Sequence, residues 1–247
     1  MSERIAGMNS VFEALQGTGR VHKIYVQEGR EGKRMQELLA LAEKRGVFCK
    51  RMERAQMDRM FSEGNHQGVI AEVETYQYAE VDDILRRAEE KGEEPFIVLL
   101  DGIEDPHNLG AIIRTAECAG VHGIILPKNN AVDVNATVRR TSAGAVAHML
   151  VAQETNLASC LQKLKDRGMW VIGADMDGKE NLHEAGIPLP AALVIGGENR
   201  GLRPLVKKNC DVVLRIPMFG TVNSLNASNA AALMIYEVVR RQHGTGK

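Results

Sequence analysis

From Pro95 onward, short apolar runs alternate with segments that have helical spacing. Residues 96–101 read FIVLLD, a continuous apolar run typical of a strand buried on both faces of a sheet. Runs of similar character follow at 123–126, 148–152, 170–174, 192–196 and 212–216, and helical patterns lie at 109–119, 157–167 and 227–241. Strands that alternate with helices of this length predict an α/β fold with a mostly parallel, wound sheet.

The N-terminal part of the chain has the pattern of a smaller α/β unit. Residues 33–45 predict an amphipathic helix, and Gly46 follows in a position that favours a helix C-terminus. A helix at 7–15 and strands at 23–26 and 68–73 complete the expected unit.

An acidic segment separates the two patterns. Residues 72–94 hold 3 Lys or Arg and 9 Asp or Glu, a net charge of −6, and are typical of a solvated linker helix. We therefore predict three parts: a small domain at 1–73, an acidic linker with a helix at 74–94, and a larger domain at 95–247.

Composition excludes several classes of protein. The chain is 44% hydrophobic and 26% charged, which is unlike a disordered chain. No apolar run approaches the roughly 20 residues of a membrane span, and no signal peptide is visible, so we expect a cytoplasmic protein without membrane contact. The net charge of −1 does not by itself indicate a nucleic-acid partner, although local basic patches still bind phosphates. The four cysteines are widely spaced, and no cluster of His, Cys and Asp suggests a metal site.

A first motif, DGIEDPHNLGAIIRTA, begins at the end of the run at 96–101. Asn108 is expected to cap the helix that follows. Arg114 lies among small and apolar residues of that helix, where a buried guanidinium is costly to place. Either Arg114 has a function there or its head group extends to solvent, and the pattern alone leaves both readings open.

A second motif, LVIGGENRGL, ends the run at 192–196. Gly196, Gly197 and Gly201 let the backbone approach a ligand closely, and ligands of open α/β sheets bind at the carboxyl ends of strands. The motif is not GxGxxG and lacks the GK[ST] of a P-loop, which argues against a dinucleotide-dependent oxidoreductase and against nucleotide hydrolysis.

A third motif, LRIPMFGTVNSLNASN, ends the run at 212–216. Ser224 or Asn226 is expected to cap the last helix. The order and spacing of the three motifs are more informative than any one of them.

Together the motifs resemble those of the SpoU family, the RNA 2′-O-ribose methyltransferases of the SPOUT superfamily. The matching residues are Asn108, Gly110, Arg114, Thr115, Gly196, Glu198, Gly201, Ile216, Pro217, Ser224, Leu225 and Asn226. The segments GMNSVFEAL at 7–15 and NHQGV at 65–69 look like the small ribosomal-protein-like domain of one branch. That branch includes an enzyme that methylates a guanosine ribose in the peptidyl-transferase region of 23S rRNA. The resemblance covers nearly the whole chain.

The resemblance implies a fold and a cofactor. The larger domain is expected to form the family's parallel sheet with a trefoil knot and to bind S-adenosylmethionine. Gly196, Ile216 and Leu225 would line the cofactor pocket, where an adenine needs apolar walls and a few backbone partners. A homodimer with the last helix at its interface is also implied, and the reaction needs no metal.

The catalytic residues implied by the resemblance are Asn108, Arg114, Glu198, Ser224 and Asn226. Their task is to place a ribose 2′-hydroxyl in line with an activated methyl group and to help its proton leave. A guanidinium hardly deprotonates, so Arg114 is either a base assisted by a substrate phosphate or a bidentate phosphate clamp. We favour the clamp for at least part of its role.

The leading functional hypothesis is S-adenosylmethionine-dependent 2′-O-ribose methylation of a guanosine in 23S rRNA. The 2′-hydroxyl target makes RNA, and not DNA, the expected partner. The small domain would select the RNA, with candidate phosphate contacts at Arg20, Lys23, Arg30, Lys33 and Arg34.

Two alternatives remain. One is a tRNA methyltransferase or an rRNA methyltransferase of antibiotic resistance with the same chemistry, and the other is a non-catalytic RNA-binding assembly factor. The extra N-terminal domain favours the rRNA branches over the tRNA enzymes. The intact motif residues favour an enzyme over a non-catalytic factor.

Overall fold

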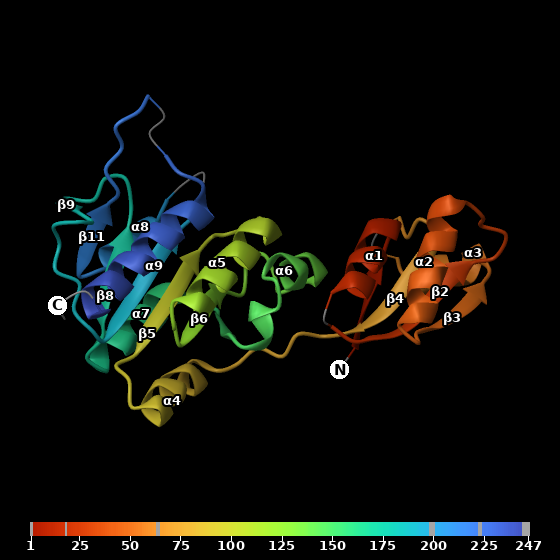
Figure 1. Ribbon diagram of the computed structural model, residues 1–247, viewed down its shortest axis with the longest axis horizontal. Helices are drawn as coiled ribbons and strands as arrows, with labels where there is room; N and C mark the ends of the chain where they lie inside the picture. Colours follow the sequence, from red (N-terminus) through yellow and green to blue (C-terminus); the bar gives the residue numbers. More distant parts are fainter. Residues whose placement is uncertain (1, 18, 63–64, 198–200, 222–223, 244–247) are drawn as a thin grey trace. The chain divides into compact units, whose positions relative to one another are not determined.

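The computed structural model describes residues 2–17, 19–62, 65–197, 201–221 and 224–243 (Figure 1). The chain forms two compact units. The smaller comprises Met1–Gln77 with Val134–Thr141, and the larger comprises Tyr78–Asp133 with Ser142–Lys247. The functional boundaries expected near residues 73 and 95 stay a prediction.

The smaller unit is built on a four-stranded sheet in the order β1-β4-β2-β3. Strands β2 and β3 pair in parallel, whereas β4 pairs antiparallel with both β1 and β2. Its elements are β1 (Ser2–Ala6), α1 (Met8–Gln16), β2 (Val21–Gln27), α2 (Lys33–Lys44), β3 (Phe48–Met52), α3 (Arg54–Met60), β4 (Val69–Glu74) and α6 (Ala136–Thr141). Helices α1 and α2 cover one face of this sheet and bury Leu15, Ile24 and Leu38, while α3 packs on the other face through Met57.

The larger unit contains a seven-stranded sheet in the order β7-β6-β5-β10-β8-β11-β9, and each neighbouring pair is parallel. Its strands are β5 (Phe96–Asp101), β6 (Gly123–Pro127), β7 (Leu150–Glu154), β8 (Trp170–Ala174), β9 (Glu180–Asn181), β10 (Ala191–Gly196) and β11 (Val212–Arg215). Its helices are α4 (Val81–Lys91), α5 (Pro106–Cys118), a short 3₁₀ helix (Ala145–Ala147), α7 (Leu157–Asp166), α8 (Pro204–Lys208) and α9 (Ala227–His243). The wound parallel sheet predicted from the alternating pattern is therefore confirmed.

Helices cover both faces of the large sheet. Ile97 and Leu99 of β5 belong to a core formed with α4 and α7. Because successive side chains of a strand point to opposite faces, Val98 and Leu100 point to the other face. There α5 and α9 pack against each other, and α9 packs against β10 (Figure 1). Every residue of β5 is buried, as the apolar run predicted.

Helix α5 begins earlier than the sequence pattern indicated. Asn108 was expected to be its N-cap, but the helix starts at Pro106 and the cap is Asp105, whose carboxylate accepts a 2.9 Å hydrogen bond from the His107 amide. Proline suits the first helical position because it has no N–H to satisfy and its φ is already helical. Asn108 consequently lies inside the first turn, and its side chain bonds to a distant segment.

Two further expectations concern membrane-spanning helices and the trefoil knot. None of the helices in the described ranges has the length and hydropathy of a membrane span. The trefoil knot stays a prediction, because residues 198–200 and 222–223 in the loops expected to form it lie outside the described residues.

Candidate active site

The three sequence motifs meet at one edge of the large sheet. Strands β5, β10 and β11 end at Asp101, Gly196 and Arg215, and because the sheet is parallel all three carboxyl ends lie at the same edge. The chain winds from β5 to β6 and β7 in one direction, and β10, β8 and β11 lie on the other side of β5. Ligands of open α/β sheets bind where the strand order reverses in this way.

A side-chain hydrogen bond joins the first motif to the third. Asn226 donates from Nδ2 to Oδ1 of Asn108, at 3.0 Å, and Asn108 is only 5% exposed. The Oδ1 atom of Asn226 accepts from the amide and the hydroxyl of Ser228, at 2.9 and 2.6 Å. Asn226 therefore caps α9, one of the two caps expected, and fixes the start of α9 against the first turn of α5.

Arg114 projects from α5 into solvent. Its neighbours Ile112 and Ile113 are fully buried, whereas Arg114 itself is exposed. Within the described part of the chain its guanidinium has no hydrogen bond, ion pair or ring contact. The five N–H groups of Arg114 thus pair with no carboxylate of the described residues, and the exposed side chain is accessible to an anionic ligand.

The glycines of the second motif occupy positions where a side chain does not fit. A Cβ added to Gly196 would lie 2.3 Å from the carbonyl carbon of Gly201, and one added to Gly197 would lie 2.4 Å from the carbonyl oxygen of Gly102. The amide of Gly201 donates to the carbonyl of Gly197 at 3.0 Å, and Gly201 has a φ of +58°. Close packing against other backbone therefore requires glycine at both positions, and the expected approach of this backbone to a ligand stays a prediction.

The other candidate residues follow β11 and precede α9. Ile216 is half-buried, Leu225 is 36% exposed, and Ser224 is exposed. Accessible apolar side chains suit an adenosine, which takes apolar walls, and the cofactor contacts of Ile216 and Leu225 stay a prediction. Glu198, expected in the catalytic set, lies outside the described residues.

The sequence reading missed two carboxylates beside the second motif. The side chain of Asp101 has no solvent exposure and accepts hydrogen bonds from the amide and Nε of Arg203, at 2.8 and 2.6 Å. Asp175, just after β8, accepts from Nζ of Lys207 at 2.9 Å and from the amide of Leu202 at 3.3 Å. Burial alone would raise the pKa of Asp175, but these donors hold it below its usual value. The sequence does mark Asp101 as unusual, because it is the charged residue that ends an otherwise apolar strand.

The candidate RNA contacts of the smaller unit differ in their surroundings. Nζ of Lys23 lies 5.3 Å from the ring centroid of Tyr25 and 5.4 Å from that of Phe48, whose side chain is 65% exposed. Arg34 hydrogen-bonds to the side-chain oxygen of Asn9. Lys23 and Phe48 thus combine a cation with an accessible aromatic face.

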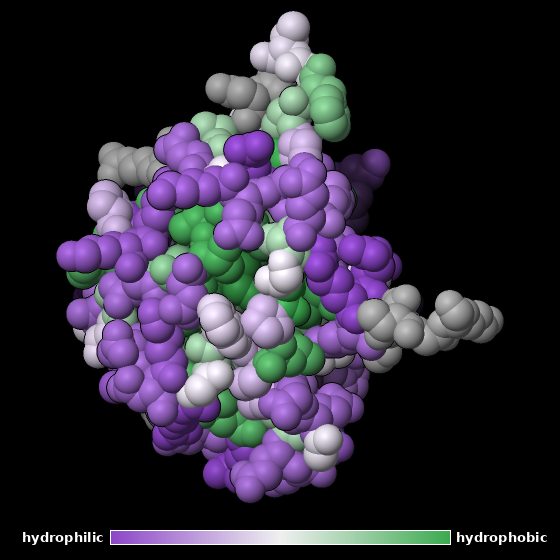
Figure 2. All heavy atoms as spheres, turned by 90° about the vertical axis from the view of Figure 1, so that its left-hand side faces the viewer, coloured by the Kyte–Doolittle hydropathy of each residue, from purple (hydrophilic) through white to green (hydrophobic). Residues whose placement is uncertain are grey.

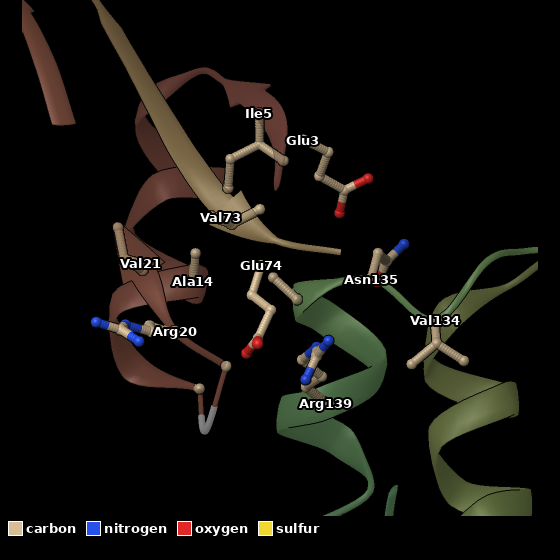
Figure 3. A pocket seen from close by; sticks show the side chains of 13 residues that line it. Glu3, Ile5, Ala14, Arg20, Val21, Val73, Glu74, Val134, Asn135 and Arg139 are labelled. Carbon is tan, nitrogen blue, oxygen red and sulfur yellow. The ribbon is translucent and has the colours of Figure 1, made fainter. Parts of the chain in front are cut away.

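A cavity in the smaller unit is too small for a nucleotide. Its volume is about 40 Å³, whereas ligand pockets are about 300–1,000 Å³. Figure 3 shows Ile5, Ala14 and Val73 at its apolar wall, with Arg139 of α6 near Glu74. Among the residues that the structure describes, no group of three or more His, Cys, Asp or Glu side chains is arranged to hold a metal ion.

The fold and the site define a class of enzyme. The family model described as SpoU rRNA Methylase matches residues 95–236, and a model described as RNA 2′-O ribose methyltransferase substrate binding matches residues 4–79. The chain therefore belongs to the SpoU family, and it is an RNA 2′-O-methyltransferase with S-adenosylmethionine as its cofactor.

Relatives that match along their whole length carry related names. A putative TrmH family tRNA/rRNA methyltransferase, YacO of Bacillus subtilis (strain 168), is 44% identical over 98% of this chain and 97% of its own. A protein of the same description from Staphylococcus haemolyticus (strain JCSC1435) is 40% identical over 98% of this chain and 97% of its own.

Solved structures agree with this membership. The SpoU methyltransferase AviRb from Streptomyces viridochromogenes, in complex with AdoMet, matches with a TM-score of 0.64 and 26% identity over 98% of this chain and 91% of its own. The AdoMet-bound rRNA methyltransferase from Sinorhizobium meliloti has a TM-score of 0.63 and 25% identity over 98% of this chain and 88% of its own. A structure described for 2-OH methylation of C/U34 on tRNA has a TM-score of 0.56 and 28% identity, over 61% of this chain and 98% of its own.

Proposed function

We propose that this protein methylates the ribose 2′-oxygen of a guanosine in 23S rRNA. The observation that carries the choice of rRNA over tRNA is the smaller unit at Met1–Gln77, which matches a substrate-binding model. The rRNA methyltransferase from Sinorhizobium meliloti aligns with 98% of this chain, whereas the structure described for tRNA aligns with 61%. A substrate as large as rRNA suits an enzyme with a second RNA-binding unit.

The carboxyl edge of the large sheet is the proposed reaction site. Gly196 offers backbone groups to the cofactor, and Ile216 and Leu225 contact its adenine through their apolar side chains. The cofactor supplies a methyl group that is already activated on a sulfonium. The task left to the protein is to orient the ribose and to help the 2′-hydroxyl lose its proton.

Atoms and charge balance in this transfer. The ribose oxygen forms a bond to the methyl carbon as the bond from that carbon to sulfur breaks, and the hydroxyl proton leaves to a base or to water. Arg114 is proposed to hold the adjacent phosphate with its bidentate fork and so to fix the angle of attack. Asn108 and Asn226 position α5, which carries Arg114, through their 3.0 Å hydrogen bond. Glu198 and Ser224 complete the proposed catalytic set.

The smaller unit is proposed to bind RNA at the surface formed by Lys23 and Phe48. An unpaired base stacks on an exposed aromatic ring, and a lysine beside that ring pairs with a phosphate. Phe48 offers such a ring, with Nζ of Lys23 5.4 Å from its centroid. The acidic segment around α4 is unsuited to this task because its charge repels phosphates.

A homodimer is also proposed, with α9 at its interface. Leu233 and Tyr236 of α9 are 45% and 49% exposed. Figure 2 shows hydrophobic side chains among polar ones on the face that lies at the left in Figure 1. Accessible apolar side chains on a helix suit contact with a second copy. We place the enzyme in the cytoplasm, where rRNA is found, and retain the trefoil knot as part of the proposal.

The test is transfer of a labelled methyl group to a panel of RNAs. The wild-type chain and Arg114→Ala would be incubated with tritiated S-adenosylmethionine and with unmodified 23S rRNA fragments, 16S rRNA or bulk tRNA. We expect label on one 23S fragment with the wild type and a large loss with the variant. Label on tRNA alone would overturn the proposed substrate. Cofactor binding without transfer to any of these RNAs, or to ribosomal particles, would favour an RNA-binding assembly factor.

A further inference from the structure

Asp101, the first residue of the first motif, bonds to both ends of the glycine loop, the segment that begins at Gly197 and ends before Arg203. The carbonyl oxygen of Asp101 accepts a 3.0 Å hydrogen bond from the amide of Gly197, where the loop begins. The carboxylate of Asp101 accepts from the amide and Nε of Arg203, where the loop has ended. Main chain and side chain of a single residue therefore fix the two ends relative to each other.

Close packing also constrains Gly196 and Gly197, where the loop begins. Gly196 pairs with Asp101 in the register of β10 with β5, and Gly197 approaches the carbonyl of Gly102 so closely that a Cβ would lie 2.4 Å away. Asp175 adds a second anchor through the amide of Leu202. Gly196 and Gly197 are thus held by Asp101 and Gly102, and Leu202 is held by Asp175.

The carboxylate of Asp101 is costly to bury without a partner. Its side chain has no solvent exposure, whereas that of Arg203 is 47% exposed. A buried carboxylate persists only where charged or polar donors satisfy it, and here Arg203 supplies two of them. The pair needs both members, and the exposed member is the one that can be replaced with least effect on the core.

We propose that Asp101 is a positioning residue for the cofactor, acting through Arg203 and Gly197 on the backbone of Gly196. The proposal rests on the proposed role of Gly196 in cofactor binding. It assigns the ion pair between Asp101 and Arg203 a function beyond stability: the carboxylate sets the direction in which the backbone groups of Gly196 and Gly197 point at the cofactor. Neither residue needs to contact the cofactor or the RNA.

The test compares Asp101→Asn with Asp177→Asn in the full-length chain. Asp177 is likewise an aspartate with a cationic partner, since its carboxylate lies 3.5 Å from Nζ of Lys207, but its side chain is 83% exposed, so it serves as the control. Affinity for S-adenosylmethionine would be measured by isothermal titration calorimetry, and KM and kcat by methyl transfer to the RNA accepted by the wild type. We expect Asp101→Asn to weaken cofactor binding and raise its KM about tenfold, with a smaller change in kcat and an unchanged KM for RNA.

Thermal unfolding of the same samples separates positioning from stability. If Asp101→Asn only lowers Tm, and cofactor affinity equals that of the wild type at a temperature where both are folded, the proposal is wrong. Should Asp101→Asn not fold, Arg203→Gln decides in the same assays, because Arg203 is half-exposed. Arg203→Lys should restore part of the affinity if charge at this point orients the loop.

Failure of this proposal is distinguishable from failure of the proposed function. Calorimetry reports cofactor binding whether or not a methyl acceptor has been found. A wild type that binds the cofactor but methylates no RNA would leave the role of Asp101 testable by affinity alone.

Discussion

Nδ2 of Asn226 donates a 3.0 Å hydrogen bond to Oδ1 of Asn108, and so connects the start of α9 to the first turn of α5. The same Asn226 side chain caps α9 with its oxygen. One amide thereby satisfies the helix end and joins two motifs that are 118 positions apart in the chain.

Replacement of Asn226 should therefore affect stability and activity together. We expect Asn226→Ala to lower the free energy of unfolding by about 1–2 kcal/mol, because α9 loses its cap and the hydrogen bond to Asn108 is lost. Methyl transfer should also fall, since α5 carries Arg114. Asn156→Ala is the control, because Asn156 caps α7 in the same way, through the amide of Ser159, but follows β7, which lies at the end of the sheet and two strands from β5. Equal activity in the two variants, assayed where both are folded, would argue against a positioning role for Asn226.

Arg114→Ala should reduce kcat at least about 100-fold with little change in stability. The side chain is exposed and forms no hydrogen bond, ion pair or ring contact with a described residue, so its removal costs the fold little. Arg114→Lys discriminates between the two roles, because lysine keeps a positive charge but lacks the bidentate fork. For a phosphate clamp we expect Arg114→Lys to stay well below wild-type activity and to raise KM for RNA. Arg167→Ala, another exposed arginine, should behave as the wild type.

Gly196→Ala should destroy cofactor binding. The added Cβ would lie 2.3 Å from backbone of Gly201, so the loop must shift, and overpacking of this kind costs about 1–3 kcal/mol. Gly186→Ala introduces the same atom where nothing lies within 4 Å. Calorimetric titration with S-adenosylmethionine should show binding by the second variant only. Wild-type affinity in Gly196→Ala would mean that the cofactor lies elsewhere.

The contribution of Glu237 to the free energy of unfolding should decrease as the pH falls into the acid range. Hydrogen bonds from Arg240 and then Arg241 lower the pKa of Glu237 from 4.5 to about 2. Because the folded pKa is depressed, the unfolded chain binds the proton first, so the stabilisation is complete above about pH 4.5 and disappears as pH falls toward 2. The difference in unfolding free energy between wild type and Glu237→Gln, about 2 kcal/mol near neutrality, should shrink over that interval in denaturant titrations. A pH-independent difference would refute the assignment.

Phe48→Ala should weaken RNA binding without touching the cofactor site. Loss of one base-stacking contact corresponds to roughly a 5- to 100-fold higher Kd for RNA. Phe48→Tyr keeps the ring and should keep most of the affinity, and Lys44→Gln removes an exposed charge from α2 as a control. Filter binding with the accepted RNA measures the effect. RNA affinity that is the same in Phe48→Ala and Lys44→Gln would exclude this surface.

The sequence predicted the larger elements because each carries a long or strongly apolar pattern. The run at 96–101 became β5 with the same bounds, and the amphipathic pattern at 33–45 became α2. Short elements were predicted only where they form an apolar run, because so few positions do not define a period. The elements that the sequence did not predict have two to seven residues and are β1, β3, α3, α6, α8 and β9. The strands β1 and β3 also carry exposed side chains, so they have no apolar signature.

The sequence predicted which motif residues belong to the candidate site, but not the contacts that hold them in place. The order and spacing of the motifs identified Asn108, Gly196 and Asn226 as candidate site residues. The parallel sheet explains why they lie at the same edge. The anchoring pair of Asp101 and Arg203 escaped, because its members are 102 positions apart and neither belongs to a periodic pattern. Contacts of that kind depend on register between strands, which a single sequence does not determine.

The chemical identity of the methylated nucleoside tests the central claim most directly. 23S rRNA treated with the enzyme and labelled S-adenosylmethionine would be digested to nucleosides and analysed by mass spectrometry, with Arg114→Ala in parallel. A ribose 2′-O-methyl group on guanosine, resistant to alkaline cleavage and much reduced in the variant, is the result we predict. A methyl group on a base, or label that is equally abundant with Arg114→Ala, would contradict the account.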